Sequence, residues 1–213
     1  MGLFGERSDV ATFLGDLLRR RKYGSPVVVV SGLPRSGTSM MMKMLEAGGV
    51  PIMTDAVRAA DVDNPKGYYE YERVKNLEKE TDKSYVREAR GKVLKVISFL
   101  LKELPADNYY HVVFMRRHLD EVIASQNKML DRRGEESIED RETMAEAYRN
   151  HLAAVKILVR KRPNFEMLEF RYDEAVGNPR AAAHAVNAFL GGTLDEAAMT
   201  AVIDAELYRN RKT

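Results

Sequence analysis

Short apolar runs alternate along the chain with longer segments in which apolar positions recur every three or four residues. The first run, from Val27 to Val30, consists of consecutive valines. An uninterrupted run of this kind is typical of a strand buried on both faces, as in a parallel sheet. Further strands are predicted over Val93–Ile97, Tyr109–Met115 and Phe165–Phe170. Because helical segments separate these strands, the pattern predicts right-handed crossovers and a three-layer α/β/α fold with a central, mostly parallel sheet.

Apolar periodicity and cap residues predict the helices. The first helix, over Asp9–Lys22, carries an apolar stripe at helical spacing and ends in four basic residues. The stripe consists of Val10, Phe13, Leu14, Leu17 and Leu18. Later helices are predicted over Tyr71–Lys83, from Arg117 to about Leu130, from Ser137 to about Lys161, from Asn178 to Leu190 and after Thr193. Ser137 and Thr193 are the predicted N-caps because Asp140 and Glu196 follow them at capping-box spacing.

The segment after the valine strand, Gly32-Leu-Pro-Arg-Ser-Gly-Thr-Ser39, has the spacing of a phosphate-binding loop. In such a loop, backbone N–H groups and the unpaired N–H groups of the next helix converge on an anion. The alternative is a glycine-rich turn that merely joins a strand to a helix. The strand before the loop and the helix after it favour an anion site formed by Arg35, Ser36, Gly37, Thr38 and Ser39.

One position departs from the P-loop pattern G-x-x-x-x-G-K-[ST], because Thr38 stands where the lysine belongs. An ATP-dependent kinase or hydrolase also needs an aspartate after a buried strand to hold Mg²⁺. Here the apolar strands run into Ser31, Arg116 and Arg171 instead. Arginine at this place favours an anionic ligand that side chains neutralise, such as an adenylate with a separate 3′-phosphate. The sequence therefore predicts a site without a metal.

Composition narrows the class of protein. A length of 213 residues suits one domain, residues 1–213. Because 34 basic side chains nearly balance 32 acidic ones, nothing indicates a nucleic-acid partner. The absence of cysteine excludes disulfides and thiolate metal sites and fits a reducing compartment. No apolar run has the length of a membrane span and no signal-peptide core is visible, so the expected location is cytoplasmic.

Three segments together resemble the sulfotransferases that use 3′-phosphoadenosine 5′-phosphosulfate (PAPS). Pro34-Arg-Ser-Gly-Thr-Ser39 matches the family's 5′-phosphosulfate loop, P-[KR]-S-G-T-[ST], at every position. Arg117 and Ser125 have the spacing of the arginine and serine in the family's 3′-phosphate site, and a helix would place them roughly on one face. Tyr172, in Tyr-Asp-Glu-Ala-Val-Gly-Asn-Pro179, resembles the family's tyrosine near the adenine. Phe189-Leu-Gly191 resembles the F-L-G that follows, so the similarity covers roughly residues 26–192.

The resemblance also implies catalytic residues, with one departure. Cytosolic members have K-T-H before the 3′-phosphate strand, and Lys95 matches this lysine, but no histidine follows it. Golgi-type and many bacterial relatives use a glutamate as the base. Glu70, in Gly67-Tyr-Tyr-Glu, resembles the bacterial segment G-Y-[FY]-E, and its tyrosine neighbours would partly desolvate the carboxylate. The implied catalytic set is Arg35, Glu70 and Lys95, and core packing or a cofactor-loop role is the alternative for Glu70.

A basic segment near the end of the chain has two interpretations. The family closes the 3′-phosphate site with an R-K-G segment, and Arg209-x-Arg211-Lys212 is similar to it. An unstructured basic tail is the alternative.

The resemblance implies sulfuryl transfer from PAPS to a hydroxyl or amine of a small-molecule or carbohydrate acceptor, with adenosine 3′,5′-bisphosphate as the other product. Two alternatives stay open at this stage. One is a small-molecule kinase or nucleotide hydrolase with a degenerate P-loop. The other is a nucleotide-binding module without catalytic activity. The acceptor and the oligomeric state are not indicated by the sequence.

Overall fold

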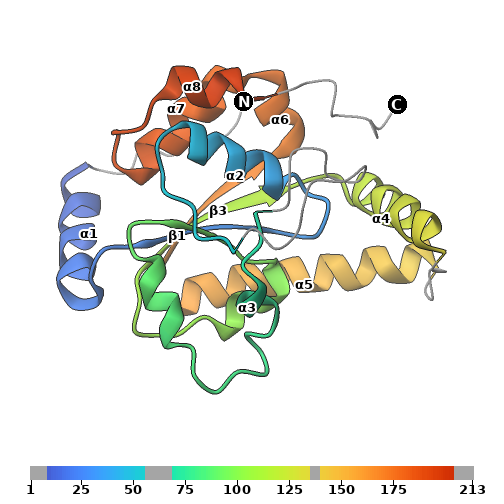
Figure 1. Ribbon diagram of the computed structural model, residues 1–213, viewed down its shortest axis with the longest axis horizontal. Helices are drawn as coiled ribbons and strands as arrows, with labels where there is room; N and C mark the ends of the chain where they lie inside the picture. Colours follow the sequence, from blue (N-terminus) through green and yellow to red (C-terminus); the bar gives the residue numbers. More distant parts are fainter. Residues whose placement is uncertain (1–8, 56–68, 135–139, 204–213) are drawn as a thin grey trace.

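The computed structural model describes residues 9–55, 69–134 and 140–203. In these ranges four strands alternate with helices (Figure 1). The strands are β1 (Val27–Gly32), β2 (Val93–Lys95), β3 (Tyr110–Arg116) and β4 (Phe165–Arg171). The helices are α1 (Asp9–Tyr23), α2 (Thr38–Ala47), α3 (Glu72–Lys75), α4 (Leu119–Arg133), α5 (Arg141–Lys161), α6 (Tyr172–Gly177), α7 (Pro179–Leu190) and α8 (Glu196–Ala201). Two 3₁₀ helices, η1 (Ser84–Ala89) and η2 (Ser98–Glu103), flank β2.

The strands form one parallel sheet in the order β2-β1-β3-β4. The two central strands, β1 and β3, are buried along almost their whole length, as the valine run predicts. Helices α2, α6, α7 and α8 cover one face of the sheet, and α5 with the 3₁₀ helices covers the other (Figure 1). The predicted three-layer α/β/α fold is therefore confirmed.

The valine strand separates two apolar cores. Successive side chains of a strand point to opposite faces. Val27 and Val29 pack into the core beneath α5, whereas Val28 and Val30 pack against α2 and α7. Three of the four methionines of α2, Met41, Met42 and Met44, are fully buried in the second core. This packing on both faces fixes the end of β1, from which the phosphate-binding loop begins.

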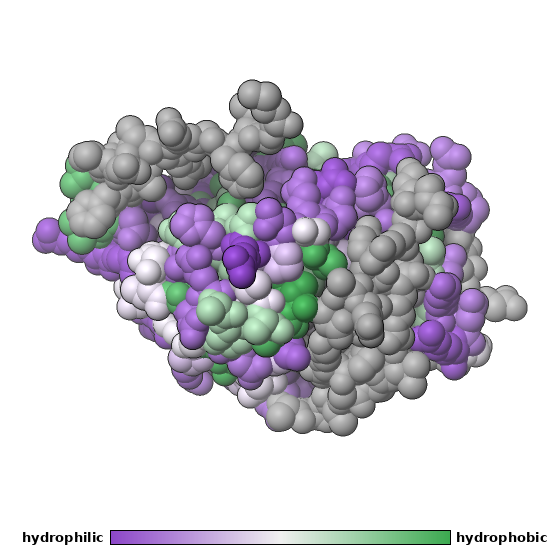
Figure 2. All heavy atoms as spheres, turned by 90° about the horizontal axis from the view of Figure 1, so that it is seen from above, coloured by the Kyte–Doolittle hydropathy of each residue, from purple (hydrophilic) through white to green (hydrophobic). Residues whose placement is uncertain are grey.

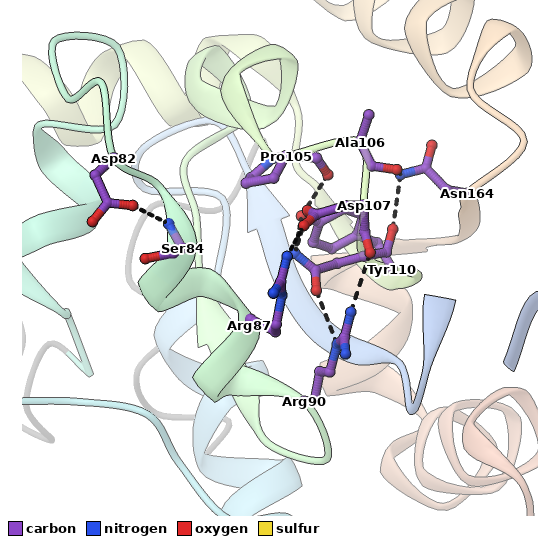
Figure 3. A network of polar contacts seen from close by, with 10 residues as sticks. Asp82, Ser84, Arg87, Arg90, Pro105, Ala106, Asp107, Tyr110 and Asn164 are labelled. Atoms are coloured by element: carbon purple, nitrogen blue, oxygen red, sulfur yellow. Dashed lines mark hydrogen bonds and ion pairs between the residues drawn. The ribbon is translucent and has the colours of Figure 1, made fainter. Parts of the chain in front are cut away.

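At the amino end of the strands, polar contacts join the loops that precede β2, β3 and β4 (Figure 3). Arg90 donates to the Asn108 side chain at 3.0 Å and to the Asp107 carbonyl at 3.1 Å. Asn164 donates to the Asn108 carbonyl at 2.8 Å, and the Tyr110 hydroxyl donates to a carbonyl of the same loop. These bonds satisfy the backbone groups that the loop before β3 would otherwise bury without partners.

The helix predicted over Tyr71–Lys83 is wrong. A single turn, α3, forms at Glu72–Lys75, and turns follow it up to η1. Only Val74 and Leu77 of this segment are buried apolar side chains. Two anchors one turn apart do not make a stripe long enough to hold a longer helix against the core.

Two predicted cap positions also need correction. Helix α5 begins at Arg141, and Asp140 is its N-cap, accepting bonds from the N–H groups of Glu142 and Thr143. The predicted cap Ser137 lies outside the described residues. Helix α8 is capped by Asp195 rather than by Thr193. Aspartate accepts the first-turn N–H bonds as well as serine or threonine does, so the capping-box spacing alone did not decide the boundary.

Helix α1 forms over the predicted range, but the three leucines of its apolar stripe do not pack on the sheet. Leu14, Leu17 and Leu18 are 51%, 53% and 67% exposed. In the described part of the chain, no helix is both long and apolar enough to cross a lipid bilayer.

Candidate anion-binding site

The loop between β1 and α2 is held in a conformation that depends on two glycines. Gly37, the N-cap of α2, has φ 99°, and the ring of Tyr172 lies where its Cβ would be, with Cδ2 2.3 Å from that position. A Cβ on Gly32 would lie 2.5 Å from the Met115 carbonyl oxygen. Arg35 has φ 68° without being a glycine. Left-handed backbone at a non-glycine residue is typical of functional loops, where surrounding contacts maintain it.

The N-terminus of α2 presents N–H groups that the helix itself leaves unpaired. Its N-cap, Gly37, has no side chain that could accept a bond from these groups. The first N–H groups of a helix have no intrahelical partners, and the helix dipole makes this end positive. The Ser36 hydroxyl is buried beside the loop and has no hydrogen-bond partner among the described residues. A buried donor without a partner and an uncapped helix end both suit a phosphate or sulfate oxygen.

Arg35 connects the loop to α4. Its Nε donates to the Ser125 hydroxyl at 3.0 Å, and Ser125 is 6% exposed. The backbone carbonyl of Arg35 accepts a hydrogen bond from Arg117 at 3.3 Å. The guanidinium of Arg35 therefore lies on the α4 side of the loop, where the sequence predicts a second anion.

Arg117 is held beside Arg35 by contacts with Glu121, with Tyr172 and with the Arg35 carbonyl. Its Nε donates to Glu121 at 2.8 Å, and the two side chains are only 9% and 3% exposed. Its guanidinium also lies over the ring of Tyr172, 4.7 Å from the ring centroid. Because Tyr172 also contacts Gly37, Arg35, Arg117, Ser125 and Tyr172 form one cluster around the loop.

Lys95 and Glu70 lie at the other side of the loop. Lys95 Nζ donates to the Ser39 hydroxyl at 3.1 Å and is 3.7 Å from a carboxylate oxygen of Glu70. Lys75 lies 3.0 Å from the second carboxylate oxygen. The predicted catalytic residues Glu70 and Lys95 are thus brought together beside the first turn of α2. Two ammonium groups, those of Lys75 and Lys95, face the Glu70 carboxylate.

Two hydrogen bonds, one from Tyr69 and one from Thr54, hold the backbone around Glu70. Tyr69 has φ 51°, and its hydroxyl donates to Glu46 of α2 at 2.7 Å. Burial, together with this bond to Glu46, raises the pKa of Tyr69 to about 12, so its hydroxyl keeps the proton that it donates. The Thr54 hydroxyl donates to the Glu70 carbonyl at 2.9 Å.

Sequence reasoning missed two residues of the site. Glu121 follows Arg117 at i+4 on α4, so the spacing of helical ion pairs was a usable signal. Lys75 had no such signal, because it follows Glu70 by five residues, which is not a spacing at which helical side chains meet. The basic segment at Arg209, Arg211 and Lys212 lies outside the described residues.

Among the described residues, no three acidic, histidine or cysteine side chains converge in an arrangement that would hold a metal ion. The histidines have other contacts. His151 lies 2.9 Å from the Ser98 hydroxyl and stacks on Phe99, and His118 lies 2.9 Å from Arg171.

A parallel sheet with an anion loop at the carboxyl end of its central strand defines a P-loop-type α/β protein. The chain belongs to the sulfotransferase domain family, whose domain matches residues 25–213. This membership supports sulfuryl transfer as the general activity. The match begins after α1, which ends at Tyr23.

Two solved structures are similar to this chain. One is a sulfotransferase from Alicyclobacillus acidocaldarius, with 14% identity and a TM-score of 0.48 over 80% of this chain and 84% of that one. The other is the sulfotransferase domain from the curacin biosynthetic pathway, with 15% identity and a TM-score of 0.43 over 78% and 74% of the two chains. Among curated proteins, none matches the chain significantly.

Proposed function

We propose that the chain transfers a sulfuryl group from PAPS to a hydroxyl or amine of a small-molecule or carbohydrate acceptor. The observation that carries the proposal is the pair of adjacent anion positions. One is the uncapped N-terminus of α2, and the other is the cluster of Arg35, Arg117 and Ser125 beside it. PAPS carries a 5′-phosphosulfate and a separate 3′-phosphate on one ribose, so it has an anion for each position.

The residues present fit such a ligand. The Ser36 hydroxyl and the first N–H groups of α2 would bind the 5′-phosphosulfate, and the buried, unpartnered Ser36 Oγ supports this. Arg117 and Ser125 would bind the 3′-phosphate. Tyr172 would lie against the nucleoside, between the loop and Arg117.

The donor supplies a sulfur atom whose bond to the bridging phosphate oxygen breaks as the acceptor oxygen or nitrogen bonds to it. Lys95 and Arg35 lie on opposite sides of the loop and would stabilise the negative charge that grows on the phosphate side. Glu70 would accept the proton that the acceptor loses. Its ion pair with Lys95, which donates to Ser39 of the loop, supports this role because it keeps the carboxylate near the loop.

Calorimetric titration with adenosine 3′,5′-bisphosphate, AMP and ATP tests the ligand assignment. We expect the bisphosphate to bind about tenfold or more tightly than AMP and to need no Mg²⁺, because charge-assisted hydrogen bonds hold the 3′-phosphate. Replacing Arg117 with alanine should remove this preference. Arg116→Ala is the matched control, since Arg116 pairs with Glu169 of β4 instead.

A second variant tests the same site in case Arg117→Ala does not fold. Ser125→Ala deletes one hydroxyl and leaves the Arg117–Glu121 pair intact, and it should lower the preference for the bisphosphate in the same direction. Equal affinity for AMP and the bisphosphate in the unaltered protein would refute the proposed 3′-phosphate site. Tight ATP binding and hydrolysis that require Mg²⁺ would favour the kinase alternative.

The assignment of the base needs an acceptor, which a screen of hydroxyl and amine compounds with PAPS would supply. Glu70→Gln should then lower turnover by roughly 10²–10⁴ with bisphosphate affinity nearly unchanged. Glu72→Gln is the matched control, because Glu72 also pairs with Lys75, at 2.6 Å. Full turnover of Glu70→Gln at every pH would exclude Glu70 as the base. Bisphosphate binding without transfer to any acceptor would support the inactive module.

A further inference from the structure

Helix α1 is attached to the rest of the protein by its polar side. Arg19 pairs with Glu166 of β4 at 2.6 Å and donates to the Pro163 carbonyl at 3.0 Å. Asp16 faces the buried ring of His111, with 3.5 Å between Oδ1 and Nε2. Its other carboxylate oxygen pairs with Arg20 at 2.5 Å. An amphipathic helix of a globular protein normally turns its apolar side chains to the core, and Leu14, Leu17 and Leu18 of α1 point away from it.

The side of α1 that faces away from the protein is apolar and basic. Leu14, Leu17, Leu18 and Arg21 follow one another at i, i+3, i+4 and i+7, so they lie in one row. The three leucines are more than half exposed, and Arg21 and the adjacent Lys22 are exposed as well. In the described part of the chain no carboxylate pairs with Arg21. Figure 2 shows hydrophobic and hydrophilic residues side by side at the left-hand end of the molecule, where Figure 1 places α1.

We propose that this outward face of α1 binds an anionic lipid surface. Leucines with basic residues at one end are the composition by which amphipathic helices lie in the membrane interface. The charge decides between this occupant and a second copy of the chain. Asp16 is turned inward and already paired, so two copies of this face would bring Arg21 and Lys22 together without an acidic partner. Anionic headgroups would neutralise both.

The position of α1 makes such binding compatible with the proposed transfer reaction. The helix leads into the amino end of β1, and the anion loop follows the carboxyl end of the same strand, so the two sites are separated by the length of β1. The helix also precedes the residues that match the sulfotransferase domain. Membrane binding through α1 would determine where the protein resides and would not depend on its donor or acceptor.

Vesicle flotation with the full chain tests the proposal. We expect binding to vesicles that contain phosphatidylserine, weak binding to phosphatidylcholine alone, and release as salt is raised, because screening weakens the attraction. Replacing Leu14, Leu17 and Leu18 with serine should lower the partition coefficient about tenfold or more. Replacing Arg21 and Lys22 with glutamate should do the same on the anionic vesicles.

A control from another helix shows whether the position matters. Ile157 of α5 is 52% exposed, close to the 53% of Leu17, and Ile157→Ser should leave vesicle binding unchanged. The α1 variants should keep their melting temperature and bisphosphate affinity, since none of the altered side chains lies in the core or at the anion loop. Absence of binding to anionic vesicles would overturn the proposal. Self-association that the leucine variant abolishes, without vesicle binding, would assign the face to a second copy.

Discussion

The contact between Gly37 and Tyr172 allows a sharp test of how the anion loop is held. Gly37→Ala would require a left-handed residue with a side chain, which costs about 1–2 kcal/mol. It would also place a Cβ 2.3 Å from Tyr172 Cδ2. Tyr172 is 5% exposed within the core, so its ring has little room to move. Overpacking of this kind costs about 1–3 kcal/mol more, and we expect a total loss of about 2–5 kcal/mol in the free energy of unfolding.

Gly49 provides the matched control for the backbone term. Its φ is 94°, close to the 99° of Gly37, but nothing lies within 4 Å of its Cβ position. Gly49→Ala should therefore lose only about 1–2 kcal/mol. Urea unfolding of both variants measures the difference, and Tyr172→Ala combined with Gly37→Ala should remove it. Equal losses for the two glycine variants would refute the steric role of Tyr172. Gly37→Ala should also weaken bisphosphate binding, because the displaced ring of Tyr172 contacts Arg117.

Two further predictions concern buried polar groups. Ser36→Ala should leave the free energy of unfolding unchanged or slightly higher, because the Ser36 hydroxyl has no partner among the described residues. It should lower bisphosphate affinity about tenfold. Urea unfolding measures the first effect and calorimetry the second, and unchanged affinity would contradict the role of Ser36 in binding. Burial lowers the pKa of His111 below its ordinary value of 6.5. The positive charge of Arg20 lowers this pKa further, whereas the carboxylates of Glu166 and Asp16 oppose the shift. The unfolded chain then binds the proton more readily, so this contribution to stability is present above pH ~6.5 and is lost as the pH falls below it. His111→Gln should flatten that part of the stability profile, and an identical slope would show that other groups cause it.

The parts of the molecule that the sequence predicted are those where local pattern and packing agree. The valine run predicted β1, and the glycine spacing predicted the loop, because both depend on neighbours in the chain. The grouping of Arg117 and Ser125 beside the loop followed from helical spacing combined with the family resemblance. These features needed no knowledge of contacts between distant segments.

The features that were missed have different causes. Lys75 lies only five residues after Glu70, so its contact is local, but five residues is not a spacing at which the side chains of a helix meet. The sequence also indicated the spacing of Leu14, Leu17 and Leu18 on α1, but not the direction in which these leucines point. That direction is set by Glu166 and His111, which lie about 150 and 100 residues further along the chain, where only the folded sheet brings them near Arg19 and Asp16.

The anion loop also has a consequence for how ligands for this protein can be found. Arg35 is bonded to Ser125 and Arg117, which are 90 and 82 residues away in sequence, and Tyr172 comes from a third segment. A ligand that bridges these segments would stabilise only the folded chain, so its binding free energy would add to the free energy of unfolding. At a concentration of 100 times Kd this amounts to about 2.7 kcal/mol. Thermal denaturation would therefore rank nucleotides and sulfated compounds directly, before any acceptor is known.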